Sequence, residues 1–302
     1  MKVKSGIVKS SSNRVFIGFS HLALTMLAFT CLYPFLIILG SSFQSESEIM
    51  TRGYAVLPQK PTLEAYRVIL GNPQSLLTSY GITILTTAIT TLLGLAVVST
   101  YGYVVARKDY PYRRALSFFA FFTMLFNGGM VPSYILISNW LGLKDSMMAL
   151  ILPLVCSAWY ILMMKGFFQT IPTALIESAK IDGAGELRIF ATIVVPISKP
   201  AFATIGLFYV LAAWNDWWLS LLYIENENLF KLQYLLMKVL NNIEFLNSYD
   251  AIKYGVVNGS TQLPTYSVRM AMCILAAGPI LVVFPFFQKY FVRGITVGAV
   301  KG

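Results

Sequence analysis

Side chains that could take part in chemistry gather at two places in this sequence, residues 171–188 and residues 214–218. The first place combines carboxylates and basic groups with two glycines, and the second combines tryptophan, asparagine and aspartate. The chain carries one histidine and no H-E-x-x-H, G-x-S-x-G or G-x-x-x-x-G-K-[ST] pattern. The sequence therefore predicts that the chain is not an enzyme and that it binds no metal, cofactor or ATP of its own.

The elements that must position these side chains are strongly apolar. Hydrophobic residues make up 57% of the 302 positions and charged residues 12%, and the mean hydropathy is +0.67. A membrane-spanning helix needs roughly 20 apolar residues, because each rises about 1.5 Å against a hydrocarbon core of about 30 Å. Six runs qualify, at residues 15–39, 79–104, 116–137, 147–164, 202–224 and 270–287. The predicted fold class is an all-α polytopic membrane protein with about six transmembrane helices.

The third run is the least regular of the six. Asn127, Gly128, Gly129 and Pro132 interrupt it, and a helix loses backbone hydrogen bonds at such a break. We expect this helix to end at Phe126 and the remainder of the run to lie along the outer surface.

The distribution of Lys and Arg predicts the orientation, because positive charge is retained on the cytoplasmic side of a membrane. With both termini cytoplasmic, 15 of the 23 basic residues fall on that side. Basic residues scattered between apolar runs also exclude nucleic acid as a partner, despite the net charge of +10. We expect one membrane domain at 15–292 between cytoplasmic segments at 1–14 and 293–302, with a cytoplasmic loop at about 170–200 and an external loop at about 225–269.

The cytoplasmic loop between the fourth and fifth runs is predicted to contain two short helices. Pro172 suits the first turn of a helix, and Gly183 and Gly185 would end that helix in the left-handed conformation. A second helix would begin near Glu186, whose carboxylate complements the helix dipole. Its apolar stretch at 187–197 is too short to span, so we expect the chain to turn at Pro196 and Pro200 into the fifth helix.

The loop resembles the EAA loop of ATP-binding-cassette importers, whose pattern is Glu-Ala-Ala, three residues, Gly, nine residues, Ile, one residue, Leu-Pro. Five residues match in register, while Ser178 replaces an alanine and Val195 a leucine. The residues that the resemblance assigns to contact with an ATPase subunit are Glu177, Ser178, Ala179, Ile181, Asp182, Gly183, Ala184, Ile193 and Pro196.

Other segments resemble the carbohydrate-uptake branch of that family, specifically the second permease of maltose importers. They include Trp214-Asn215, Asn127-Gly128-Gly129, residues 287–294 and residues 298–302. The resemblance implies a type I importer permease in a bacterial cytoplasmic membrane. It would pair with a second permease, two cytoplasmic ATPase subunits that bind ATP and Mg, and an external solute-binding protein that delivers an oligosaccharide. It also implies a contact of the tail residues Gly298, Val300 and Lys301 with the ATPase, although a solvated basic tail fits them equally.

The fifth run contains the candidates for a substrate path, Trp214, Asn215, Asp216 and Trp218. At about 100° per residue, Trp214 and Trp218 share a face of a continuous helix and Asp216 points almost opposite. A carboxylate in a membrane helix requires a partner or water. Asp216 fits helix packing or sugar contact, and Trp218 fits sugar contact or the aromatic belt at the outer interface.

Two other functions remain open from the residues alone. One is a permease of an ATP-driven importer for a solute other than sugar. The other is a secondary transporter, which would usually place several ionisable residues in its spans. The predicted spans contain only His21 and Asp216, so a separate source of energy is favoured.

Overall fold

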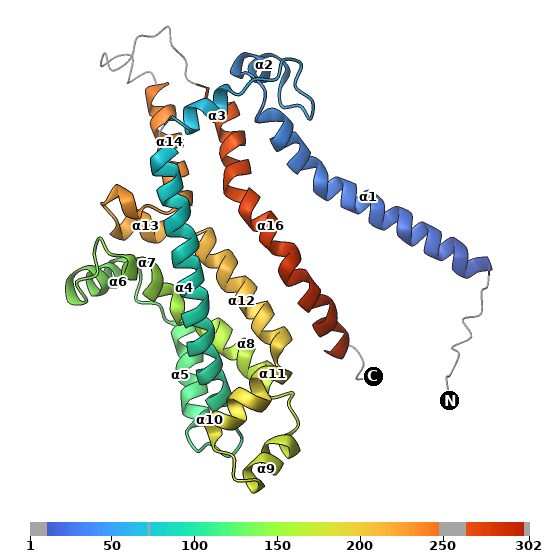
Figure 1. Cartoon of the computed structure of the whole chain (residues 1–302), viewed down its shortest axis with the longest axis vertical. Coiled ribbons are helices and arrows are strands. Elements are labelled where there is room, and N and C mark those ends of the chain that lie inside the picture. Colours follow the sequence, from blue (N-terminus) through green and yellow to red (C-terminus); the bar gives the residue numbers. More distant parts are fainter. Residues whose placement is uncertain (1–10, 72, 248–263, 299–302) are drawn as a thin grey trace. The chain divides into compact units, whose positions relative to one another are not determined.

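The structure, a computed structural model, describes residues 11–71, 73–247 and 264–298. In these ranges every regular element is a helix (Figure 1). The chain divides into two compact units, one of Met1–Gly71 with Asn242–Leu275 and the other of Asn72–Asn241 with Ala276–Gly302. The helical content agrees with the all-α class expected from the apolar runs.

The first unit contains α1 (Ser11–Ser41), α2 (Glu46–Arg52) and α3 (Glu64–Ile69). The first helix exposes its apolar side chains along its length, with Phe16, Phe19 and Phe29 each about two-thirds exposed. A helix that is apolar all round is suited to lipid. At its end Gly40 is required, because a Cβ there would lie 2.1 Å from the carbonyl oxygen of Val56.

A carboxylate of the first unit caps the long helix α16 (Tyr266–Gly298). Both oxygens of Glu46 accept hydrogen bonds from the backbone nitrogens of Thr265, Tyr266 and Ser267, at 3.0–3.2 Å. A helix begins with unpaired N–H groups and a partial positive charge, so a carboxylate is favourable there. Glu46 thereby joins the start of α2 to the start of α16.

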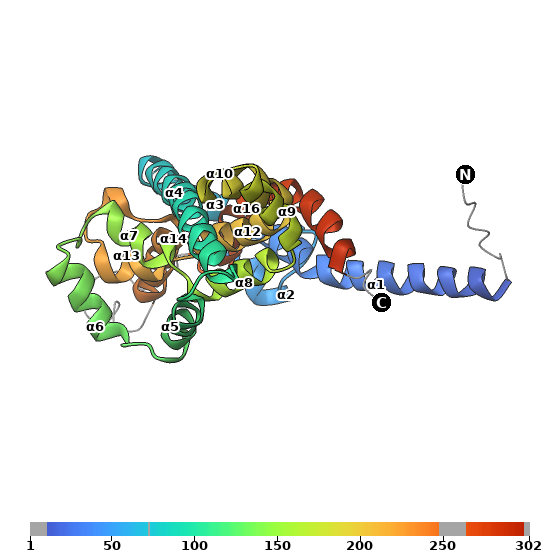
Figure 2. The ribbon, with the colours of Figure 1, turned by 90° about the horizontal axis from the view of Figure 1, so that it is seen from below.

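The second unit is built around α4 (Pro73–Ala106), which packs against α5 (Arg113–Leu125), α7 (Met147–Val155), α8 (Ala158–Phe168) and α12 (Lys199–Trp214) (Figures 1 and 2). Small residues on α4 permit α8 and α12 to approach it closely. A Cβ on Gly94 would lie 2.5 Å from the ring of Tyr209, and a Cβ on Gly102 would lie 3.0 Å from Met164 Cβ. The main apolar core therefore sits where α4, α8 and α12 meet.

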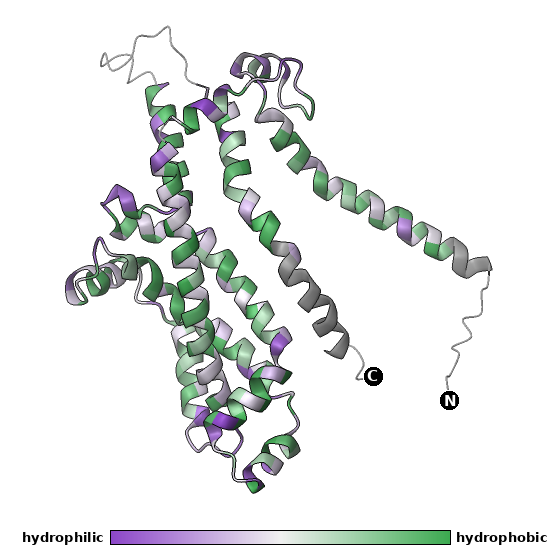
Figure 3. Cartoon of the chain, in the orientation of Figure 1, coloured by the Kyte–Doolittle hydropathy of each residue, from purple (hydrophilic) through white to green (hydrophobic). Residues whose placement is uncertain are grey.

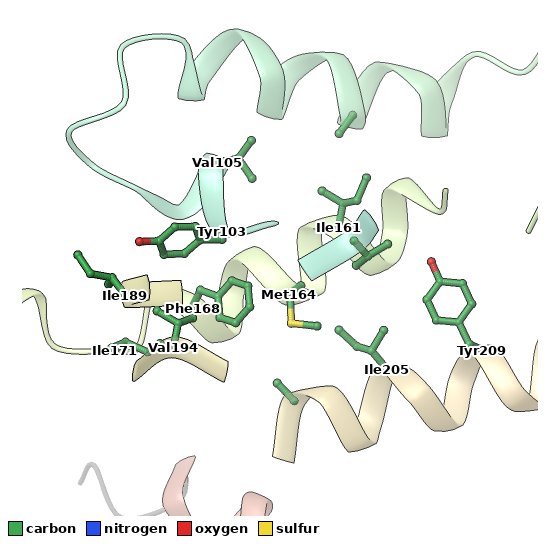
Figure 4. Packing of buried hydrophobic residues seen from close by; sticks show 13 residues of the cluster. Tyr103, Val105, Ile161, Met164, Phe168, Ile171, Ile189, Val194, Ile205 and Tyr209 are labelled. Atoms are coloured by element: carbon green, nitrogen blue, oxygen red, sulfur yellow. The ribbon is translucent and has the colours of Figure 1, made fainter. Parts of the chain in front are cut away.

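Figure 4 shows this core at close range. Val98, Met164 and Ile205 have no exposed surface or almost none, and Tyr103 and Phe168 extend the cluster toward Ile189 and Val194 of the loop that precedes α12. The core thus continues from the long helices into the loop that carries the EAA-like residues.

Within the described residues, three helices are long and apolar enough to cross a membrane, and three bent helix pairs raise the number to six if each pair is one span. The third predicted run bends by 112° between α5 and the pair α6 (Met130–Ile135) and η1 (Leu136–Trp140). Its first helix ends at Leu125 with Phe126 as C-cap, which confirms the predicted break.

The fourth run is not the continuous helix that was expected. It bends by 45° between α7 and α8, where Cys156 and Ser157 are extended. The carbonyl of Val155, which a continuous helix would pair internally, accepts a hydrogen bond from the Tyr209 hydroxyl at 2.8 Å. Tyr209 thus satisfies a backbone group that the break leaves free.

The remaining elements in the described residues are α9 (Thr173–Ile181), α10 (Glu186–Ile189), η2 (Phe190–Val194), α11 (Val195–Ile197), α13 (Trp218–Tyr223), η3 (Glu227–Leu229) and α14 (Leu232–Leu246). Figure 3 shows hydrophilic residues gathered at the end of the second unit that carries α9 and α10, whereas α4 and α12 are largely hydrophobic.

Candidate functional site

The loop at residues 172–198, here called the α9–α11 loop, has the two-helix form expected from its residues. Gly183 follows α9 with φ +79°, and the N–H of Ala184 donates to the carbonyl of Ala179 at 2.9 Å. This left-handed glycine ends the helix as predicted. Gly185 does not, because it is extended at φ −69°, ψ 159° and stands as the N-cap of α10. The prediction that both glycines end α9 is therefore wrong for Gly185.

The predicted coupling residues divide between the surface of the loop and its attachment. Glu177, Ser178, Asp182, Gly183 and Pro196 are exposed, and so is Ile181, at 86%. Ala179, Ala184 and Ile193 are half-buried and pack against the main core. An apolar Ile181 beside polar residues gives the tip of the loop a surface suited to a protein partner.

Five polar side chains connect this loop to the end of α4, and we call them the polar cluster. Arg107 donates to both oxygens of Asp109, at 2.9 and 2.6 Å, and approaches Glu186 at 3.4 Å. Lys180 of α9 pairs with Asp109 at 2.8 Å and with Glu186 at 3.0 Å. The Tyr103 hydroxyl donates to Glu186 Oε2 at 2.7 Å. Two carboxylates and two cations thus meet between three helices.

The charges of the polar cluster hold one another ionised. Hydrogen bonds from Arg107 and then Lys180 keep the pKa of Asp109 far below its usual range. The pKa of Lys180 is raised by its hydrogen bonds to Asp109 and Glu186. The Glu186 carboxylate, predicted from sequence to complement the dipole of α10, therefore also forms ion pairs that the sequence did not predict.

The loop ends where the chain turns into the fifth span. The helical segments Glu186–Ile197 and Lys199–Trp214 meet at 82°, and the buried Ser198 lies at the corner with φ −92°, ψ 16°. Pro196 and Pro200 flank this corner, so the predicted turn is confirmed.

The fifth run is broken where a continuous helix was expected. The chain leaves α12 at Trp214 and enters α13 only at Trp218, so the argument that Trp214 and Trp218 share one helical face is wrong. Trp214 is 5% exposed and donates from Nε1 to the carbonyl of Ala276 at 3.0 Å. Asn215 is exposed and lies 3.5 Å from the side-chain nitrogen of Gln233. We call residues 215–217 the α12–α13 break.

Asp216 has a partner in Lys231, a residue that sequence reasoning did not select. Lys231 has no exposed surface, and its Nζ lies 3.1 Å from Asp216 Oδ2 and donates also to the carbonyl of Ala213. The expected partner for Asp216 is therefore present. The signal in the sequence is a lone lysine between Phe230 and Leu232, because a cation in an apolar run requires a counter-charge.

Trp218 and the tail complete the predicted site residues. Trp217 and Trp218 are 38% and 44% exposed, and their rings meet edge to face at 5.5 Å. Gly298 is the last residue of α16, and Val300 and Lys301 lie outside the described residues. The part of the chain that the structure describes contains no group of three or more metal-ligating side chains.

Comparisons with known proteins agree with these features. Residues 99–297 match the family described as binding-protein-dependent transport system inner membrane component. The polygalacturonan/rhamnogalacturonan transport system permease protein YtcP of Bacillus subtilis is 36% identical over 293 residues, covering 96% of this chain and 99% of its own length. Protein LplC of the same organism is 36% identical over 299 residues, covering 99% of this chain and 97% of its own length.

A solved structure is similar as well. In the crystal structure of a bacterial ABC transporter involved in the import of the acidic polysaccharide alginate, one chain is 30% identical and superposes with a TM-score of 0.74. The match covers 93% of this chain and 98% of that chain.

Proposed function

Since this chain belongs to the family of inner membrane components of binding-protein-dependent transport systems, a family of transport permeases and not of catalysts, we propose that it forms half of the pathway for an oligosaccharide in an ATP-driven importer. The relatives named for polygalacturonan, rhamnogalacturonan and alginate support a substrate derived from a polysaccharide. A second permease would complete the pathway, and an external solute-binding protein would deliver the sugar.

The observation that supports this function best is the form of the α9–α11 loop. Gly183 ends α9 in the left-handed conformation at an exposed tip, with Glu177 and Ile181 exposed beside it. A short helix that projects from a membrane domain offers one compact surface to a soluble partner. We propose that two ATPase subunits, which bind ATP and Mg, drive the importer and that one of them receives this tip.

The orientation follows from the same proposal. With α9 to α11 and both termini in the cytoplasm, the basic residues near Arg107, Arg113 and Lys180 also lie on the cytoplasmic side. The membrane is then the cytoplasmic membrane of a bacterium. The side that carries Trp217 and Trp218 faces outward, where the binding protein releases its sugar.

The test is reconstitution of the chain with its candidate partners in proteoliposomes. We expect uptake of oligogalacturonides or maltodextrins only when ATP, the ATPase, the second permease and the binding protein are all present. The purified chain alone should not hydrolyse ATP. Uptake driven by an ion gradient without ATP would instead identify a secondary transporter, and uptake of another class of solute would overturn the sugar assignment.

A further inference from the structure

Among the four charged side chains of the polar cluster, one cation is much less exposed than the other three. The side chain of Arg107 is 12% exposed, whereas those of Asp109, Lys180 and Glu186 are 54%, 41% and 53% exposed. Its guanidinium also lies 5.7 Å from the centre of the Tyr103 ring, at the last turns of α4. Arg107 is thus the most buried of the four charged members of the cluster, and it lies against Tyr103, the member that belongs to the main core.

The α9–α11 loop is attached to the membrane domain by apolar contacts as well as by the ion pairs of this cluster. Ile176, Ala179 and Ala184 pack against the main core, and the ring of Phe190 lies 5.2 Å from that of Tyr103. Ion pairs this exposed contribute little to stability, since solvent screens them. The cluster instead fixes how its side chains are oriented. A guanidinium that binds a carboxylate through two nitrogens fixes the direction of the carboxylate as well as its distance.

A cavity separates α9 from the end of α4 beside the cluster. Its volume is about 820 Å³, and its lining includes Arg107, Arg113, Ile176, Glu177 and Lys180. A helix that borders such a space can move without pushing directly on its neighbour. The ion pair of Lys180 with Asp109 links two residues that line the cavity and so joins α9 to the residues that follow α4. The ion pair of Lys180 with Glu186 joins α9 to the start of α10.

We propose that Arg107 is a positioning residue that transmits movement of the α9–α11 loop to α4, through Asp109 to Lys180 and through Glu186 to the start of α10. This inference rests on the proposed function, in which an ATPase moves the tip of the loop. The movement then reaches α7, α8 and α12, since α4 packs against all three. The ATPase-docking surface at Gly183 and this joint are separate parts of the loop.

The experiment uses the whole importer in proteoliposomes and measures oligosaccharide uptake, ATP hydrolysis and the amount of ATPase that co-purifies. Arg107→Gln should leave the ATPase bound and hydrolysing ATP, while the sugar taken up per ATP falls by about tenfold, a size typical of coupling between sites. Arg107→Lys should recover part of the ratio, because it restores the charge without the two-nitrogen fork. Lys108→Gln is the matched control, since it removes the same charge one residue later from an exposed position.

Glu186→Gln adds a test of the connection itself. If Arg107 and Glu186 act through each other, the double variant should be no worse than the more defective single variant. An unchanged ratio of uptake to ATP hydrolysis in Arg107→Gln would overturn the proposal, and so would loss of the ATPase from that variant. Failure of the unaltered importer to couple ATP to uptake would instead refute the proposed function.

Discussion

The α9–α11 loop and the α12–α13 break are both interruptions of helix, but they are stabilised in opposite ways. The loop turns at an exposed left-handed glycine and is tied by several half-exposed ion pairs. The break is stabilised by a buried ion pair, in which the side chain of Lys231 is fully buried and that of Asp216 is 11% exposed. An exposed turn can contact a partner protein, whereas a buried ion pair stabilises the fold of the chain itself. Variants of the two regions should therefore fail in different assays.

The largest effect on transport is expected at Gly183. A bulky residue there adopts a left-handed conformation that costs about 1–2 kcal/mol for a non-glycine residue, and it also projects from the tip toward the partner. Apart from the two neighbouring residues, no atom in the described part of the chain lies within 4 Å of a Cβ at Gly183, so a side chain there begins in open space. Gly183→Trp should abolish uptake while the protein still inserts into the membrane.

Three further variants separate strain from contact at this tip. Gly183→Ala introduces the backbone strain of a left-handed residue without a large side chain, so it should reduce uptake only partly. Gly185→Ala introduces neither, because Gly185 is extended, and it should transport normally. Glu177→Ala should be milder than Gly183→Trp. Uptake and co-purification of the ATPase are measured for all four variants. Normal uptake by Gly183→Trp would mean that this tip is not the contact with the ATPase.

The largest effect on stability is expected at Lys231. Lys231→Met leaves Asp216 without its counter-charge and the Ala213 carbonyl without its donor, and removing one partner of a buried pair costs roughly 3–5 kcal/mol. Thermal unfolding in detergent should begin at a clearly lower temperature, and less complex should assemble.

Lys238→Met is the matched control, because Lys238 pairs with Glu227 at the surface. Adding Asp216→Asn to Lys231→Met should restore part of the loss, and equal stability of Lys231→Met and the control would contradict a structural role for the pair.

Much of the fold could be predicted from the sequence, because apolar runs, Gly183 and the two prolines act locally. The six runs, the end of the third helix near Phe126 and the turn before the fifth span all depend on residues close together in the chain. The EAA-like loop could be recognised for the same reason, because all of its matching residues lie within 20 consecutive positions.

The breaks in the fourth and fifth spans depend on contacts between distant residues, which apolar periodicity does not contain. Tyr209 pairs with a carbonyl 54 residues away, and Lys231 reaches Asp216 from 15 residues away. The polar cluster likewise joins Tyr103 to Glu186, 83 residues later. Predicting any of these contacts requires knowing which helices are neighbours. For that reason Arg107, Asp109 and Lys231 were not selected from the sequence.

The smallest effect is expected at Asn215, which shares the break with Asp216 but has an exposed side chain. If residues of the break contact the sugar, Asn215→Ala should weaken uptake of oligosaccharide by raising the concentration needed for half-maximal transport, with assembly and thermal stability unchanged. Trp214→Phe is the contrasting variant, because it removes the hydrogen bond from Nε1 to Ala276 at a buried position and should lower the unfolding temperature instead. Transport measured over a range of sugar concentrations, together with thermal unfolding of both variants, tests the distinction. Unchanged transport by Asn215→Ala would assign this side of the break to packing or to the membrane interface, with the sugar path elsewhere in the permease pair.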